Sequence, residues 1–357
     1  MTRQTSTYLD FIRFSAALIV FIGHVSGQRM TGGFLWPVAP FMSEAVTIFF
    51  VLSGFVIGYV RDRKEASPGA FIVSRAARIY SVAFPALVLT FALDAFGTFV
   101  NPGVYNASWG YSSVNQLWQF IAGALFVNRL WFSDVTPGSN LPYWSLGYEV
   151  WYYIIFGLGT FLAGWRRIGA VALGMAIAGP QILAMFPLWL LGVGCYRLSS
   201  TVRINPLAGA LVCIGSTAAW LGYEVWAIRH GRLIGLAPSS LGRPELLQDY
   251  LVAACFAGQL LGFDAMSGIF SVPGRLANAV RWTAGATFSL YLFHLPVAQI
   301  LTAASPWPLA SAPNRIWVFG GTLLIAFALA ALTERKKDAW RAGLTTLVAR
   351  VVPVSVT

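Results

Sequence analysis

The sequence predicts an all-α, polytopic integral membrane protein with about ten transmembrane helices. The prediction rests on its composition, its apolar runs and the placement of its basic residues. Of the 357 residues, 57% are hydrophobic and only 10% are charged, whereas a soluble domain carries about 25% charged residues. The apolar runs repeatedly approach the ~20 residues needed to cross a bilayer. Such a chain lacks the polar surface to face water on all sides.

Ten apolar segments are predicted to cross the membrane. In chain order they are residues 9–27, 44–60, 79–100, 143–164, 168–186, 187–198, 206–228, 250–267, 282–303 and 316–332. A further apolar segment, 117–127, is too short for a full span. We predict that it is re-entrant or interfacial.

The basic residues predict the orientation of these spans. With a cytoplasmic N-terminus and a non-crossing 117–127 segment, 17 of the 24 lysines and arginines fall in inside loops, 6 fall outside, and Arg13 lies within a span. Positively charged loops stay in the cytoplasm, so both termini are predicted there, with a basic cytoplasmic tail at 336–357. The net charge of +11 is therefore attributed to topology and anionic lipid headgroups, not to nucleic-acid binding.

The first span contains three ionisable side chains, Asp10, Arg13 and His24. Arg13 and His24 are eleven positions apart, which is three helical turns plus roughly 20°, so they share one face and lie roughly 16 Å apart along the axis. An arginine at the inner end suits phosphate binding, and a histidine farther out suits proton transfer. Alternatively, Arg13 pairs with Asp10 and His24 is a satisfied polar residue near the outer surface.

Two later spans add further candidates. Glu149 lies near the outer end of the fourth span, at a depth comparable with that of His24. We expect it to orient His24, to stabilise its imidazolium form or to bind an acceptor hydroxyl. His294 lies in the middle of the ninth span with Tyr291 three residues earlier on the same face. A supporting role is favoured for this pair, although a catalytic one is left open.

The segment between the second and third spans ends in a pair of arginines, Arg75 and Arg78. If the third helix begins early, both project to one side and form a phosphate clamp; otherwise they are ordinary positive-inside residues. Ser53 and Gly54 in the preceding span are small residues that permit close helix packing. The three cysteines have no metal-binding or redox spacing, and no metal site is predicted.

Five blocks in order, LDFIRFSAALIVFIGH, FFVLSGFVI, SRAARIYSVAFP, YWSLGYEVWYY and FSLYLFHLP, resemble the membrane-bound acyltransferase-3 family. The resemblance covers essentially the whole chain, with residues 1–335 as the acyltransferase-3 transmembrane domain. Many members of the family carry an extra extracytoplasmic hydrolase-like domain, which this sequence does not contain.

The resemblance implies roles for the matching residues. His24 is the expected catalytic residue, and Glu149 matches the acidic position of the tryptophan-serine-leucine block. Arg13, Arg75 and Arg78 are expected to bind the acyl donor. Four residues are assigned supporting roles: Asp10, Ser53, Tyr291 and His294.

The implied function is an O-acetyltransferase of the bacterial cell membrane. It moves an acyl group, commonly acetyl, from cytoplasmic acyl-CoA to a hydroxyl of a surface or exported carbohydrate, with no tightly bound cofactor. His24 acts as general base or forms a transient acyl-histidine. The alternatives are a glycan or lipid transporter without acyl transfer and an accessory subunit of an envelope assembly. Any partner from envelope biosynthesis stays open.

Overall fold

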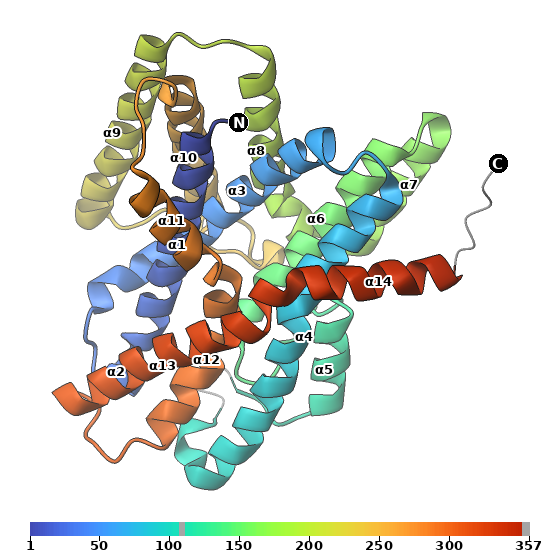
Figure 1. The fold of residues 1–357 in the computed structure, drawn as a ribbon. Helices are drawn as coiled ribbons and strands as arrows, with labels where there is room; N and C mark the ends of the chain where they lie inside the picture. Colours follow the sequence, from blue (N-terminus) through green and yellow to red (C-terminus); the bar gives the residue numbers. More distant parts are fainter. Residues whose placement is uncertain (107–110, 352–357) are drawn as a thin grey trace.

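The computed structural model describes residues 1–106 and 111–351, and the side chains of 347–351 are not described. The described residues form helices without strands (Figure 1). The long helices are α1 (Arg3–Val25), α3 (Met42–Arg63), α4 (Pro68–Val100), α6 (Trp144–Phe161), α7 (Gly164–Ala178), α8 (Pro180–Thr201), α9 (Pro206–His230), α10 (Leu246–Met266), α11 (Gly274–Ala284), α12 (Thr287–Ala303), α13 (Ala312–Leu332) and α14 (Lys337–Val351). Short helices are α2 (Gln28–Thr31), η1 (Trp36–Phe41), η2 (Pro102–Val104), α5 (Gln116–Ala124), η4 (Leu141–Tyr143), η5 (Ser239–Leu241) and η6 (Glu334–Lys336).

The predicted polytopic, all-helical membrane class is confirmed. Seven helices of the described residues are long and apolar enough to cross a membrane, or eight if the bent pair α11 and α12 is one span. The axes of that pair differ by 46°. The predicted number of ten also counted α6 and α7, which do not meet these limits. The number of spans and the side of the termini therefore stay predictions.

One predicted boundary is wrong. The sequence placed a break between segments 168–186 and 187–198, but α7 ends at Ala178 and α8 runs from Pro180 to Thr201 with Pro187 inside it. The break lies at Gly179, whose φ of 81° favours glycine, and Pro180 follows at the first helical position. Pro187 is tolerated because neighbouring helices in a membrane protein compensate for its missing N–H.

The short apolar segment 117–127 is a single short helix rather than a span. Helix α5 has 9 residues, which rise only about 14 Å, well short of the ~30 Å hydrocarbon core. The helix lies beside α4 (Figure 1). This length agrees with the predicted re-entrant or interfacial segment.

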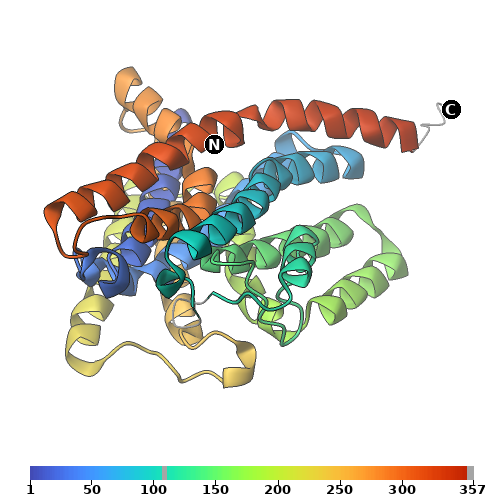
Figure 2. The same cartoon turned by 90° about the horizontal axis from the view of Figure 1, so that it is seen from below.

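The molecule has two distinct end faces (Figure 2). Helices α11 and α14 and the start of α1 lie toward one face, and the segment that joins α9 to α10 lies at the opposite face. The predicted basic tail is helical from Lys337 to Val351, and α14 crosses over α4. The remaining part of that predicted tail, 352–357, lies outside the described residues. The start of α1 and helix α14 therefore lie toward the same face.

Helix α12 lies in the interior of the bundle and packs against α1, α4 and α13. Nearly all of its side chains are buried, among them His294, Tyr291 and Ser289. In a lipid solvent, a helix that is buried on all sides can carry polar side chains that would be costly at the lipid surface. The predicted polar residues of the ninth span are thus placed inside the protein.

Helices α3 and α8 approach each other closely through two glycines. A Cβ atom built on Gly54 would lie 1.9 Å from the Trp189 carbonyl oxygen, and one on Gly192 would lie 1.9 Å from the Val51 carbonyl oxygen. Both obstacles are backbone atoms, so they cannot move aside as a flexible side chain could. Close approach through small residues is a common means of helix association in membranes.

We expect Gly54→Ala to destabilise the protein by about 2 kcal/mol or more, because the added methyl group forces α3 and α8 apart. Gly194→Ala in α8 is the matched control, since nothing lies within 4 Å of a Cβ at that position. Unfolding in detergent mixtures with increasing SDS measures the difference. Equal unfolding midpoints for the two variants would contradict the proposed tight contact.

Candidate functional site

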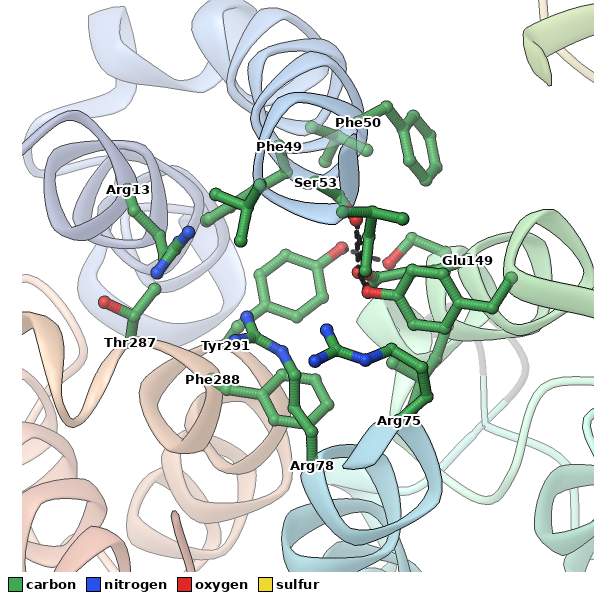
Figure 3. Close-up of a pocket in the computed structure, with 16 residues that line it drawn as sticks. Arg13, Phe49, Phe50, Ser53, Arg75, Arg78, Glu149, Thr287, Phe288 and Tyr291 are labelled. Carbon is green, nitrogen blue, oxygen red and sulfur yellow. Dashed lines mark hydrogen bonds between the residues drawn. The ribbon is translucent and has the colours of Figure 1, made fainter. Parts of the chain in front are cut away.

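A polar cavity lies between α1, α3, α4, α6 and α12, in the half of the bundle near the start of α4 (Figure 3). We call it the inner cavity. Its charged and hydroxyl-bearing lining residues are Arg13, Ser53, Arg75, Arg78, Ser145, Glu149, Tyr153, Thr287 and Tyr291. Four of the five predicted catalytic and donor-binding residues therefore line one cavity.

The three arginines of the inner cavity have different partners. Arg75 Nη2 lies 2.9 Å from Glu65 Oε1, and Arg13 Nη1 lies 3.8 Å from Asp10 Oδ1. The Arg13–Asp10 pair agrees with the alternative noted from the sequence, yet Arg13 also lines the cavity. Among the described residues, the Arg78 guanidinium has no hydrogen bond or ion pair to another side chain. Figure 3 shows the three guanidinium groups around a common space.

The early start of α4 explains the pairing of Arg75 and Arg78. The helix begins at Pro68, with the Ser67 hydroxyl accepting a hydrogen bond from the Ala70 N–H. Two full turns of helix therefore precede Arg75, and the spacing of three places both arginines on the same side. Such a cluster of planar donor groups can bind phosphate oxygens.

Glu149 is held inside the inner cavity by hydroxyl groups. The Ser53 hydroxyl donates to Glu149 Oε1 over 2.7 Å, and the Tyr153 hydroxyl donates to the same oxygen. Trp189 Nε1 in turn donates to Ser53 Oγ over 3.1 Å. Glu149 Oε2 has no hydrogen bond within the described part of the chain. Ser53 thus supports Glu149 directly, in addition to lying beside Gly54.

A second cavity contains His24, and we call it the outer cavity. It lies between η1, the start of α3, the η4–α6 junction and the segment that joins α9 to α10. Its lining includes Trp36, Ser43, Trp144, Arg232, Ile234, Arg243, Glu245 and Gln248. The α9–α10 segment lies at the face opposite α14 (Figure 2), so the two cavities approach the interior from opposite sides.

The hydrogen bonds of His24 fix which of its nitrogens is free. His24 Nδ1 lies 3.0 Å from the Val20 carbonyl oxygen, and His294 Nδ1 lies 3.0 Å from the Leu290 carbonyl oxygen. Carbonyl oxygens only accept, so each Nδ1 carries a proton. His294 Nε2 lies 3.1 Å from His24 Nδ1, so the single His24 Nδ1–H is shared between the Val20 carbonyl oxygen and His294 Nε2, which both accept. His24 Nε2 is left with a lone pair, as a general base requires.

The partner of His24 is therefore a histidine, and Glu149 has other partners. One of the three roles predicted for Glu149 was to orient His24, but its hydrogen bonds go to Ser53 and Tyr153 in the inner cavity. Glu149 and His24 lie on different helices. Their comparable predicted depth in the membrane therefore could not show whether their side chains are in contact. The catalytic assignment of Glu149 stays a prediction.

Tyr291 connects the two cavities. Its side chain lines both, as does Val46. The Tyr291 and Ser145 hydroxyls are 2.8 Å apart, and the Tyr291 ring centroid is 6.4 Å from that of His294. The two cavities therefore adjoin at Val46 and Tyr291, and His24 lines the outer cavity. This junction is the place where two substrates could meet.

Two ion clusters form the wall of the outer cavity, and neither was singled out from the sequence. Arg232 pairs with Glu44 and Glu224, and Arg243 pairs with Asp249 and Glu245. Burial is the largest single influence on the pKa of Arg243 and lowers it, but the Asp249 and Glu245 carboxylates together with Tyr148 outweigh burial, so the net direction is upward. The sequence feature that could have indicated these clusters is the presence of two carboxylates, Glu44 and Asp249, at the ends of apolar segments.

A family model described as an acyltransferase domain matches residues 6–335. The Nodulation protein 10 of Rhizobium leguminosarum bv. viciae is 27% identical over 97% of this chain and 96% of its own. The Exopolysaccharide production protein ExoZ of Rhizobium meliloti (strain 1021) is 25% identical over 82% of this chain and 88% of its own. The Acyltransferase MdmB of Streptomyces mycarofaciens is 30% identical over 50% of this chain and 47% of its own, so the match spans about half of that relative. No solved structure gives a significant match.

Proposed function

Because the chain belongs to the acyltransferase family whose model covers residues 6–335, we propose that it transfers an acetyl group from cytoplasmic acetyl-CoA to a hydroxyl group of a carbohydrate on the opposite side of the cell membrane. The observation that carries the proposal is that the cavity lined by Arg13, Arg75 and Arg78 adjoins, at Tyr291, the cavity that contains His24. The names of two relatives refer to exopolysaccharide production and nodulation, which supports a carbohydrate acceptor.

The inner cavity is the proposed donor site. Arg13, Arg75 and Arg78 supply positive charge at its lining, and the phosphates of coenzyme A supply the matching negative charge. The unpaired Arg78 guanidinium is the strongest candidate for a phosphate contact. Two polar atoms of other lining residues, Arg75 Nε and Thr287 Oγ1, are buried and have no hydrogen-bond partner within the described residues. A bound donor would satisfy such groups.

The proposed chemical step takes place beside Tyr291. His24 Nε2 removes the proton of the acceptor hydroxyl while the hydroxyl oxygen attacks the thioester carbonyl carbon. A C–O bond forms, the C–S bond breaks, and the departing thiolate takes the proton from His24 Nε2. His24 Nδ1–H remains hydrogen-bonded to the Val20 carbonyl oxygen and to His294 Nε2, and these two acceptors hold the imidazole in the required tautomer. Attack of His24 itself on the thioester would give an acyl-histidine by the same route.

Labelled acetyl-CoA supplied to membranes that contain the protein tests the function. The proposal requires transfer of label from acetyl-CoA to a saccharide, whereas a transporter or an accessory subunit would transfer none. Mass spectra of glycans from cells with and without the gene would identify the acetylated sugar. Absence of both the label and the mass difference would contradict the proposal.

His294 is the proposed positioning residue for His24, and two substitutions separate that role from packing. His294→Phe fills the space but removes the acceptor, so we expect kcat to fall about 10- to 100-fold with little change in KM for acetyl-CoA. His294→Gln can place its amide oxygen where Nε2 accepts from His24 Nδ1–H and should recover part of the rate. Initial-rate measurements on both variants test this role. Equal loss of kcat in the two variants would contradict it.

A further inference from the structure

The outer cavity has an unusual charge pattern, because each of its two arginines lies between two carboxylates. Arg243 Nε lies 2.7 Å from Asp249 Oδ2, and Arg243 Nη1 lies 3.7 Å from Glu245 Oε2. Arg232 Nη2 lies 2.6 Å from Glu224 Oε2, and its Nη1 pairs with Glu44. Four carboxylates thus accompany two guanidinium groups. Even if Glu44 and Glu224 share one proton, the two clusters together keep a negative excess.

The arginines are also fixed in position. Arg243 Nη2 donates to Asp249 Oδ1 over 3.0 Å and to Ser43 Oγ over 2.9 Å. Asp249 is fully buried, and the Thr47 hydroxyl donates to it over 2.6 Å. A guanidinium held in this way is an oriented hydrogen-bond donor whose charge is already balanced. Such a group suits a neutral hydroxyl better than a second anion.

The remaining lining fits a sugar ring. Trp36 is 52% exposed, and the Arg243 guanidinium carbon lies 5.3 Å from the centroid of the Trp144 ring. Gln248 donates to Glu44 Oε1 over 3.1 Å, so its amide is oriented as well. Flat aromatic surfaces beside a few fixed polar groups are the usual composition of a small-molecule site.

We propose that the outer cavity selects an uncharged or amino-bearing sugar and disfavours a sugar that carries a carboxylate or a phosphate. This inference rests on the proposed function, which identifies the outer cavity as the site of the sugar acceptor. It adds a statement about the charge that the acceptor can carry. The carboxylate with the most exposed side chain in the two clusters is Glu245, at 28%. Glu245 lines the cavity directly, so of the four carboxylates it is expected to have the strongest electrostatic effect on a bound sugar.

Matched oligosaccharides that differ only in charge test the selection. Oligoglucosides, oligoglucosamines and oligoglucuronides are offered to the protein in nanodiscs, and binding is measured by saturation-transfer NMR. One excess negative charge within about 8 Å should weaken binding of the uronide on the order of tenfold relative to the neutral glucoside. Equal or tighter binding of the uronide would overturn the charge selection. Absence of binding by all three would overturn the sugar site.

Substitution of Glu245 tests whether this carboxylate causes the charge preference. Glu245→Gln should raise the ratio of uronide to glucoside binding several-fold, and Glu245→Lys should raise it further. Asp134→Asn is the matched control, because Asp134 is 75% exposed, pairs with Arg129 and lies outside the cavity lining. An unchanged ratio in both Glu245 variants would contradict the inference. Label transfer from acetyl-CoA is measured separately, so a protein that shows the charge preference without transfer would refute the proposed function alone.

Discussion

His24→Ala is expected to lower acyl transfer by about a thousandfold or more. The substitution removes the imidazole base that lines the outer cavity, and general-base catalysis contributes roughly 10²–10⁴ in rate. It also leaves His294 Nε2 without its donor, His24 Nδ1. The turnover of labelled acetyl-CoA by membranes with equal amounts of folded protein measures the loss.

The remaining histidine of the chain, His230, provides the control for the loss of an imidazole. His230 lies at the exposed end of α9, where its ring stacks on Trp226 with centroids 5.1 Å apart. His230→Ala should therefore keep near-normal turnover. Folding of both variants is checked by size-exclusion chromatography and thermal unfolding. Near-normal turnover of well-folded His24→Ala protein would refute the assigned base.

Arg78→Ala is expected to raise KM for acetyl-CoA about 30- to 100-fold, with a smaller effect on kcat. The Arg78 guanidinium faces the inner cavity without a side-chain partner among the described residues, so its binding capacity is available to a phosphate. Loss of a charge-assisted, partly buried contact costs roughly 2–3 kcal/mol. Titration of the protein with unacylated coenzyme A measures the same loss without turnover.

Two further variants distinguish a phosphate contact from general positive charge. Arg78→Lys keeps the charge but loses the planar fork of donors, so its affinity should lie between those of Arg78→Ala and the parent. Arg166→Ala removes an exposed basic residue of α7 and should leave the titration unchanged. If Arg166→Ala weakened coenzyme A binding as strongly as Arg78→Ala, diffuse membrane-surface charge would be the better explanation.

The sequence alone was sufficient to predict the all-helical membrane class and most of the charged residues that line the inner cavity. Apolar runs predict spans directly, and the i, i+3 spacing of Arg75 and Arg78 predicts a shared side within one helix. Arg13 and His24 both lie on α1, so their spacing could likewise predict that they share one face of that helix. Such arguments work within one helix, where the backbone geometry is known in advance.

Contacts between helices were harder to predict. The His24–His294 hydrogen bond joins residues 270 positions apart, and their meeting depends on how α12 rotates and packs against α1. For the same reason, the contacts of Glu149 with Ser53 and Tyr153 were not predicted, and a contact with His24 was left as one of three possible roles. The break at Gly179 was missed because Pro187 was the stronger local signal, although lipid-embedded helices tolerate an internal proline.

The outer clusters were missed for a different reason. Arg232 and Arg243 fall in a segment that was counted as an outside loop, where basic residues carry topological meaning. Their partners, Glu44 and Asp249, come from α3 and α10. Only the folded arrangement shows that these charges compensate one another at the wall of a cavity.

Transfer across sealed membranes tests most directly whether donor and acceptor meet beside His24 from opposite sides. Everted vesicles from cells that express the protein expose the cytoplasmic face, and labelled acetyl-CoA is added outside. The account predicts label on saccharide inside these vesicles, no labelling in right-side-out vesicles given the same donor, and no labelling in everted vesicles with His24→Ala. Equal labelling in both orientations, or undiminished labelling with His24→Ala, would contradict it.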